Sequence, residues 1–437
     1  MTDFEKLYQE KKCTMQDVLD SIRSGDVIFT TNNYSEPGEI LSHIHEIAPR
    51  VENVKVWKGR SGLYPFMVDP SMKGHIEMYN YFFGPTFYKN SLPMGLVDYV
   101  PTDLQSYFTV AVSGHPANIA ITASTPMDEN GNFHVPMNHA ADGLGILDAI
   151  ENHKTIIVEV NPNLHHMHGS VEINIRDVAM LVEVDRPEYT VPSIESTPLE
   201  RKIGEAVASL VSDGDTIQLG IGGIPNAVGT FLKDKHDLGI HSEMFTTSMM
   251  ELIQAGVITG ARKTYDKGLH VCAFAEGVPE LYPFLQSRED CILRSGYEVV
   301  DPFHIARQDN MVSINTLVEI DLTGQVCAES IGPKQISGSG GGFCFAYGTY
   351  RSKGGKGILA FPSRTAKGQS KIKCTLTPGA VVTTPRNYVD YVVTEYGIAQ
   401  LKGKTISERA KQLIAIAHPD DRAELKRQAK ALNFNYL

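Results

Sequence analysis

An internal repeat constrains the fold of this chain more than any other feature of its sequence. The turn Ser24-Gly25-Asp26 leads into a short apolar run, a polar loop and a helical pattern at residues 38–47. The same layout recurs at Asp213-Gly214-Asp215, followed by an apolar run, a glycine-rich loop and a helical pattern at residues 226–233. Each copy predicts a turn, a strand, a loop and a helix. Such repetition predicts two halves of similar topology.

A second pair of segments supports this interpretation. Residues 119–133 and 316–327 each contain an apolar strand pattern and a polar-Gly turn, Asn130-Gly131 in the first and Thr323-Gly324 in the second. Strands that alternate with helices predict parallel sheets, so we expect two similar α/β domains. The alternative is that such turn and strand patterns recur by chance, as they do in many α/β proteins.

The boundary between the halves is expected near residue 190. Residues 185–200 contain Pro187, Pro192 and Pro198 and show no apolar periodicity, which is typical of a linker. A chain of 437 residues favours two domains, because single cores stop growing at roughly 250–300 residues. We therefore predict an N-terminal domain at 1–190 and a C-terminal domain at 191–437.

Composition excludes several classes of function. The net charge of −11 argues against a broad surface for nucleic acid or anionic membranes. No apolar window is long enough to span a membrane, and the charged N-terminus lacks a signal-peptide core, so we expect a cytoplasmic protein. The six cysteines form no C-x-x-C pair, which gives no indication of a disulfide framework or a zinc ribbon.

The glycine-rich loop Gly220-Ile221-Gly222-Gly223-Ile224-Pro225 is the first candidate site. Glycines between a strand and a helix let backbone N–H groups approach a phosphate closely. The loop lacks the dinucleotide fingerprint, because Pro225 stands where a third glycine is required. A tight turn without a ligand is the alternative.

Glu243 follows this loop by about twenty residues, the spacing of the acidic residue that binds a ribose in dinucleotide folds. It could instead be a carboxylate nucleophile at the end of a strand, or an ordinary solvated surface residue. The run Ile336 to Phe343, with four glycines in five positions, suits backbone amides that point into an oxyanion hole; a flexible hinge is the alternative.

Two further clusters stand out. Lys353, Lys356, Lys367, Lys371 and Lys373 form a basic stretch in an acidic chain, which could meet phosphates or could be a solvated loop. The run His165-His166-Met167-His168 lacks the spaced partners of a metal site, so we expect no metal and interpret it as a surface or substrate loop.

Taken together, these motifs resemble the acetyl-CoA hydrolase/transferase family, closest to its 4-hydroxybutyrate and butyryl-CoA:acetate CoA-transferase branch. The resemblance rests on strings distributed over the whole chain: Phe83-Gly84-Pro85, Asn161-Pro162-Asn163, Gly220 to Pro225, the segment around Glu243, Gln335-Ile336-Ser337-Gly338-x-Gly340-Gly341, Thr383-Thr384-x-Arg386-Asn387, Tyr391 to Ala399, and Leu401-x-Gly403-Lys404.

The resemblance implies two similar open α/β domains with the active site between them. It implies ping-pong transfer of coenzyme A, a substrate and not a permanently bound cofactor, between a short-chain acyl-CoA and a carboxylic acid such as acetate. By position, Glu243 resembles the nucleophile. The other carried-over roles are an oxyanion or thioester role for Gly340, Gly341 and Asn315, and CoA binding by Gly220, Ile221, Gly222, Gly223 and Ile224. Lys353 and Lys373 are candidates for the CoA phosphates by their charge.

The chain departs from the family pattern at Gly342 and Cys344, where relatives have Gln and Asp. In the first half, polar residues predict a substrate pocket that favours a polar or dicarboxylic acyl group: Asn32, Asn33, Tyr34, Glu36 and Arg60. We expect a homodimer or a homotetramer. The alternative functions are a thioester hydrolase, a non-catalytic CoA-binding protein and a nucleotide-dependent oxidoreductase, the last disfavoured by Pro225.

Overall fold

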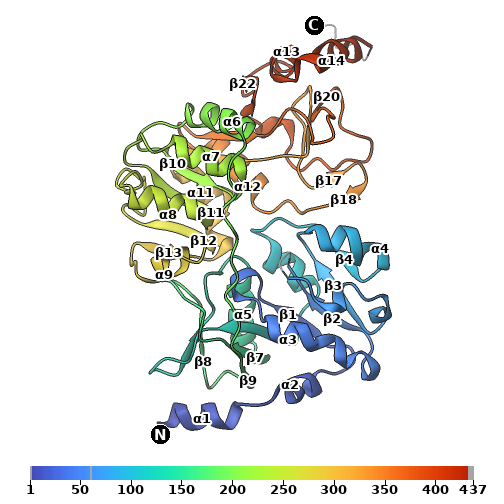
Figure 1. Cartoon of the computed structure of the whole chain (residues 1–437), viewed down its shortest axis with the longest axis vertical. Helices are drawn as coiled ribbons and strands as arrows, with labels where there is room; N and C mark the ends of the chain where they lie inside the picture. Colours follow the sequence, from blue (N-terminus) through green and yellow to red (C-terminus); the bar gives the residue numbers. More distant parts are fainter. Residues whose placement is uncertain (1, 60–61, 432–437) are drawn as a thin grey trace. The chain divides into compact units, whose positions relative to one another are not determined.

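The computed structural model describes residues 2–59 and 62–431 of the chain (Figure 1). Its contacts define two compact units, Met1–Val191 with Ala273–Glu298, and Pro192–Cys272 with Val299–Leu437. One division falls at residue 191, but residues 273–298 cluster with the first unit. The division into two continuous domains, 1–190 and 191–437, therefore stays a prediction. Each unit is described separately below.

The first unit is built on a seven-stranded sheet in the order β4-β3-β2-β1-β5-β7-β9, in which all neighbours run parallel. The strands are β1 (Val27–Thr30), β2 (Val54–Trp57), β3 (Ile76–Asn80), β4 (Val97–Tyr99), β5 (Ile119–Ser124), β7 (Thr155–Val160) and β9 (Met180–Glu183). The helices are α1 (Asp3–Lys11), α2 (Met15–Ser21), α3 (Gly38–His43), α4 (Leu92–Met94) and α5 (Asp142–Glu151), and β6 (Asn132–His134) pairs separately with β8 (Glu172–Asn174).

A second sheet of eight strands has the order β13-β12-β11-β10-β14-β19-β21-β22. Its strands are β10 (Thr216–Leu219), β11 (Gly239–Thr246), β12 (His270–Glu276), β13 (Cys291–Leu293), β14 (Met311–Asn315), β19 (Lys356–Ala360), β21 (Tyr391–Thr394) and β22 (Gly397–Gln400). The longer helices are α6 (Pro198–Ala208), α7 (Gly223–Phe231), α8 (Thr247–Gln254), α12 (Gly342–Arg351), α13 (Ile406–Ile416) and α14 (Pro419–Ala431).

Both sheets wind outward from a central strand, β1 or β10, first to one side and then to the other. Only β22, antiparallel to β21, has no counterpart at the end of the first sheet. The expectation of two halves with similar parallel α/β topology is therefore confirmed.

The repeated turns also match in atomic detail. Gly25 and Gly214 both adopt positive φ, 82° and 80°, and the aspartate that follows each accepts a hydrogen bond from a backbone N–H three residues earlier. In the second pair, Asp128 and Asp321 each accept from the N–H groups two and four residues onward, around Gly131 and Gly324. Identical turn chemistry at matched positions makes chance recurrence an inadequate explanation.

Most of the expected helices and strands lie where the sequence predicts them, with one instructive shift. Helix α7 begins at Gly223, three residues before the expected start. Gly222 provides the N-cap with a φ of 132°, and Pro225 sits in the first turn, where its missing N–H has no intrahelical partner to lose. No described helix is long and apolar enough to cross a membrane.

Candidate functional site

The second unit has a hollow at the carboxyl edge of its sheet. Strands β10, β14 and β19 are parallel neighbours, so their carboxyl ends meet at one edge. The strand order reverses direction at β10 and β14, which is where open α/β sheets bind ligands. The hollow has a volume of about 260 Å³ and is lined by Glu200, Ile221, Gly222, Gly223, Ile224, Pro225, Ile314, Asn315, Thr316, Ala360 and Pro362.

The glycine loop is shaped by close neighbours on one side and open space on the other. A Cβ on Gly223 would lie 2.3 Å from the Glu200 carboxylate, so no larger residue fits there without displacing that side chain. At Gly222 a Cβ would meet nothing closer than 3.9 Å, but the positive φ disfavours other residues. The loop therefore presents its backbone to the hollow at Gly222.

Glu243 lies level with this loop. The pairing of Thr216 with Gly239 and of Ile217 with Ile240, continued along β11, brings Glu243 opposite Gly220, just beyond the end of β10. Its side chain is partly exposed. Glu243 lies within β11, which continues to Thr246, and not at the end of that strand as expected, although it is level with the carboxyl end of β10.

The backbone of Gly341 lies directly against the Glu243 carboxylate. A Cβ at position 341 would be 2.1 Å from Glu243 Oε2 and 2.8 Å from Val300 Cγ1, closer than real Cβ contacts allow. Gly341 is the N-cap of α12, so the positive end of that helix dipole faces the carboxylate. Two residues singled out separately, about a hundred positions apart, therefore meet.

Asn315 is oriented by a residue that sequence reasoning missed. Gln218, buried in β10, accepts hydrogen bonds at Oε1 from Ile314 N and from Asn315 Nδ2, both at 3.2 Å. The second contact fixes the Asn315 amide at the rim of the hollow. Gln218 is the one amide side chain in β10, but nothing in the sequence indicates its partners at the end of β14.

The predicted lysines do not gather at this hollow. Lys353 precedes β19, at the opposite edge of the sheet, where its carbonyl accepts from Asn310 N. Lys373 lies in β20 (Ile372–Lys373), in register with Asp321. Of the basic stretch, Lys371 is nearest to the carboxyl edge, with Nζ 3.5 Å from the Leu317 carbonyl and burial that lowers its pKa.

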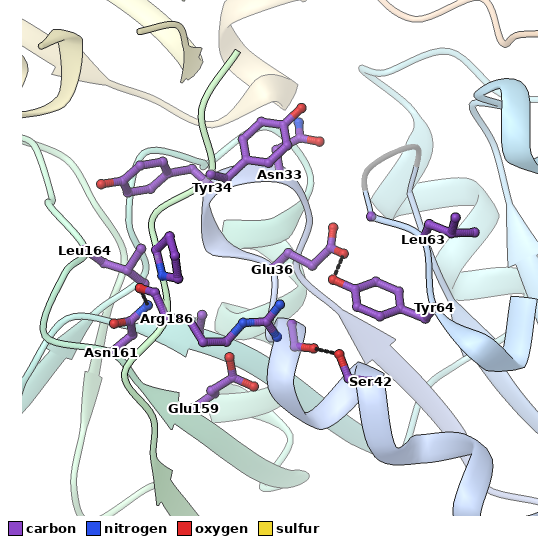
Figure 2. A pocket seen from close by; sticks show the side chains of 15 residues that line it. Asn33, Tyr34, Glu36, Ser42, Leu63, Tyr64, Glu159, Asn161, Leu164 and Arg186 are labelled. Atoms are coloured by element: carbon purple, nitrogen blue, oxygen red, sulfur yellow. Dashed lines mark hydrogen bonds between the residues drawn. The ribbon is translucent and has the colours of Figure 1, made fainter. Parts of the chain in front are cut away.

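The first unit has its own hollow, of about 300 Å³, beyond the carboxyl ends of β1, β5 and β7 (Figure 2). Of the predicted substrate residues, Asn33, Tyr34 and Glu36 line it, and Arg60 lies outside the described residues. Glu36 accepts from the Tyr64 hydroxyl, as Figure 2 shows, and from the fully buried Lys58 at 3.1 Å. The Tyr34 hydroxyl donates to Glu188 at 2.6 Å.

Asn32 lies beneath this hollow and is not part of its lining. Its backbone N and Nδ2 donate to the buried Asp142 at 2.7 and 2.9 Å, and its Oδ1 accepts from Gly59 N at 2.6 Å. Burial raises the pKa of Asp142 to about 7. Asn32 therefore joins the loop after β1 to the loop after β2, and acts as a support for the predicted pocket.

Glu159 and Arg186 complete the first hollow and were not expected from the sequence. Glu159 accepts hydrogen bonds from the backbone N–H groups of Glu39 and Ile40 at the start of α3. Burial raises the pKa of Glu159 to about 7 and outweighs the opposite effects of these hydrogen bonds and of the Arg186 charge. Arg186 Nη1 lies 3.5 Å from Glu39 Oε2 but forms no hydrogen bond with any described residue. The Nη1 atom of Arg186 is therefore buried without a hydrogen-bond acceptor among these residues, with the Glu39 carboxylate as its nearby counter-charge.

The histidine run is used structurally. His165 contacts the Tyr34 hydroxyl, and the His166 ring stacks on His134 with centroids 4.1 Å apart. Within residues 2–59 and 62–431, no group of three or more His, Cys, Asp or Glu residues could hold a metal ion.

Comparison with known proteins places the chain among enzymes. Residues 277–429 match the acetyl-CoA hydrolase/transferase C-terminal domain. The chain is 38% identical to 4-hydroxybutyrate coenzyme A transferase of Clostridium kluyveri, covering 98% of this chain and 99% of that protein. It is 36% identical to succinyl-CoA:cyclohexane-1-carboxylate CoA transferase of Geobacter metallireducens, covering 98% and 97%. The crystal structure of RipA from Yersinia pestis superposes with a TM-score of 0.91 at 32% identity, covering 99% of this chain and all of that one.

The raised pKa of Glu159 predicts a pH-dependent stability. In the folded protein the group stays protonated up to about pH 7, whereas an unfolded glutamate ionises near 4.5. Between pH 4.5 and about 7 the folded protein therefore keeps a proton on Glu159 that the unfolded chain has released. The free energy of unfolding falls as pH rises through this range, by about 3 kcal/mol at most. Thermal unfolding at pH 5.5 and 8 should show a smaller loss in Glu159→Gln than in the native protein.

The matched control is Glu151→Gln, at an exposed position in the same unit, which should keep the native pH dependence. Asp142, whose pKa is also raised, remains in all three proteins and contributes a common background. Equal pH dependence in the native protein and in Glu159→Gln would contradict the assignment.

Proposed function

The chain belongs to the acetyl-CoA hydrolase/transferase family, and on that premise we propose that it transfers coenzyme A between a short-chain acyl-CoA and a carboxylate such as acetate, with Glu243 as the nucleophile. The single observation that carries the assignment of Glu243 is its contact with the backbone of Gly341. The Glu243 carboxylate lies beside the N-terminus of α12. Backbone N–H groups at this helix start would donate hydrogen bonds to the oxygen on which negative charge develops during the reaction.

The proposed reaction has two half-reactions. The Glu243 carboxylate attacks the thioester carbonyl, and the C–S bond breaks to give a mixed anhydride and CoA thiolate. The thiolate then attacks the glutamyl carbonyl, which releases the first carboxylic acid as its carboxylate and leaves a glutamyl-CoA thioester. The second carboxylate reverses these steps and regenerates Glu243. Because the thioester's energy is kept in covalent bonds, the transfer needs no ATP.

Backbone groups supply the stabilisation of charge in this proposal. The amides of Gly340 and Gly341 donate to the oxyanion that forms when the thioester carbonyl is attacked, an interaction worth roughly 3–4 kcal/mol per donor in comparable sites. Asn315, held by Gln218, is at the rim of the hollow and would contact the thioester region. Gly220 to Ile224 would hold CoA through backbone N–H groups.

The geometry revises the proposed contacts to the CoA phosphates. Lys353 is at the opposite edge of the sheet from the glycine loop, so we no longer favour it for this role. Lys371 is a better candidate, since its ammonium lies beside the loops that follow β14 and β19. Lys373 pairs with the strand that carries Asp321 and stays a weaker alternative.

The hollow of the first unit is our candidate for the acyl group. Arg186 and Asn33 would pair with a second carboxylate on the acyl chain, and Glu36 would accept from a hydroxyl; a plain alkyl chain can make none of these contacts. Of the relatives named above, one is named for 4-hydroxybutyrate and the other for succinyl-CoA and cyclohexane-1-carboxylate. 4-Hydroxybutyrate and the succinyl group carry a polar group distant from the carbonyl that bonds to CoA, whereas cyclohexane-1-carboxylate does not.

Position 341 gives a direct test of the proposed nucleophile. Gly341→Ala would drive its Cβ into the Glu243 carboxylate and displace it, so kcat for CoA transfer should fall by about a hundredfold, as for a nucleophile misplaced by about 1 Å. Gly342→Ala is the matched control, because a Cβ there meets nothing within 4 Å. Steady-state kinetics with saturating acetate measure both; equal losses in the two variants would contradict the proposal.

A panel of acceptor acids tests the proposed acyl pocket. With one acyl-CoA donor, kcat/KM should be higher for succinate and 4-hydroxybutyrate than for butyrate. Arg186→Gln should reduce the advantage of succinate, and the surface variant Arg176→Gln should not. Butyrate far ahead of both polar acids in the native enzyme would rule out the pocket. Consumption of acyl-CoA without any acceptor would favour the hydrolase alternative.

A further inference from the structure

A second hollow of the C-terminal unit has no part in the chemistry proposed above. It has a volume of about 570 Å³ and is lined by Tyr350, Arg386, Asn387, Tyr388, Gly403, Lys404, Thr405, Ile406 and Arg409. A volume of this size is typical of small-molecule sites. Two sequence strings without an assigned role meet here, Thr383-Thr384-x-Arg386-Asn387 and Leu401-x-Gly403-Lys404.

This hollow lies at the edge of the sheet opposite to Glu243. Arg386–Tyr388 precedes β21, and Lys404 follows β22, whose last residue Gln400 pairs with the first residue of β21. Both loops therefore lie where the parallel strands begin. Helix α12 runs from Gly341 at the carboxyl edge to Tyr350 near its other end, a separation of about 15 Å for ten residues.

Positive charge is concentrated at the hollow. The exposed side chains of Arg386 and Lys404 form no hydrogen bond or ion pair with any residue in the described ranges. Lys402 lies close by, with Nζ 4.2 Å from the Tyr350 ring centroid and 2.9 Å from its carbonyl. Two carboxylates interact with these lysines: Glu408, in the capping box of α13, with Lys404, and the buried Asp390 with Lys402. Cations outnumber anions here in a chain whose net charge is −11.

Arg409 holds the two loops together from below. This side chain is only 8% exposed and donates to the carbonyls of Arg386 at 2.6 Å and of Lys404 at 3.3 Å. The third partner is the carbonyl of Thr323 at 3.1 Å, next to Gly324, where a Cβ would lie 2.9 Å from Nη1. The backbones that carry the two exposed cations are therefore fixed before any ligand arrives.

Repulsion between cations adds a second observation. Burial lowers the pKa of Arg409; the charge of Arg386 acts in the same direction, whereas Tyr350 raises it. An anion placed between Arg386, Lys404 and the N-terminus of α13 would relieve this repulsion and gain charge-assisted hydrogen bonds.

Aromatic rings border the same cations. The Tyr388 ring meets Tyr350 edge-on, with centroids 5.7 Å apart, and Tyr347 in the same way at 4.8 Å. A planar base can stack on such rings while its phosphate binds the basic side chains. Rings and cations together match a nucleotide better than they match a simple inorganic anion.

We propose that this hollow, at the edge of the sheet away from Glu243, binds a phosphate-bearing nucleotide. In this proposal Arg386, Lys404 and the start of α13 bind the phosphate, and the base stacks on the ring of Tyr388. A free nucleotide separate from the substrate is the expected source, because the glycine loop proposed to hold CoA lies at the other edge of the sheet. The 3′-phosphoadenosine end of CoA is the source that the experiment must distinguish from it. None of the residues takes part in the reaction at Glu243, so the site stands or falls independently of the proposed function.

Calorimetric titration of the full chain with three probes tests the site: 3′,5′-ADP, 5′-ADP and pyrophosphate. The variants are Arg386→Gln and Lys404→Gln, and the control is Lys411→Gln, an exposed position on the same helix that is outside the lining. Native protein and control should bind alike, whereas each variant should bind at least tenfold more weakly. Thermal unfolding of every variant verifies that it folds.

The probes also separate the two sources. Weaker binding of 3′,5′-ADP together with a raised KM for acyl-CoA would identify the end of CoA as the occupant. Weaker binding of 5′-ADP by the variants, with KM for acyl-CoA unchanged, would identify a separate nucleotide. Binding of pyrophosphate without binding of either nucleotide would show a simple anion site and overturn the proposal. Absence of binding to the native protein, or equal binding to native protein and both folded variants, would overturn the proposal.

Discussion

The closeness of the Gly341 backbone to the Glu243 carboxylate is the constraint on which the rest of the candidate site depends. A Cβ at position 341 would overlap the carboxylate at 2.1 Å, so only glycine lets the two segments approach as they do. This contact joins β11 to the N-terminus of α12, and the parallel sheet holds the glycine loop and Asn315 at the same edge. The proposed chemistry of the site therefore depends on the absence of a side chain at position 341.

The duplicated topology shows how one framework supports two different hollows. In each sheet the chain leaves the central strand at the carboxyl edge, where the strand order reverses and ligands are expected. After β10 the loop is made of glycines, which expose backbone groups. After β1 the corresponding loop carries Asn33, Tyr34 and Glu36, which expose side chains. The same position thus offers amides in one unit and polar side chains in the other.

The sequence predicted the topology and singled out both residues of the central contact, but it did not predict that they touch, nor did it identify the supporting residues. Turn chemistry is local, so the matched turns at Gly25 and Gly214 were visible in the sequence and identified the repeat. Glu243 and Gly341 were identified separately, from spacing and glycine content, but only the packing of α12 on the sheet shows that they touch. Sequence alone could not reveal Gln218, Glu159 or Arg186, because their roles depend on neighbours distant in the chain. Charge alone misplaced Lys353, since a basic stretch does not reveal which edge of a sheet it borders.

The most direct test of the central claim is the mass of the intact protein after incubation with an acyl-CoA in the absence of an acceptor acid. A glutamyl-CoA thioester at Glu243 would raise the mass of the native protein by that of CoA less one water. Added acetate should remove this adduct, and Glu243→Ala should not form it. An adduct that persists in Glu243→Ala, or turnover by the native protein with no adduct under any condition, would contradict the assignment of Glu243 as the nucleophile.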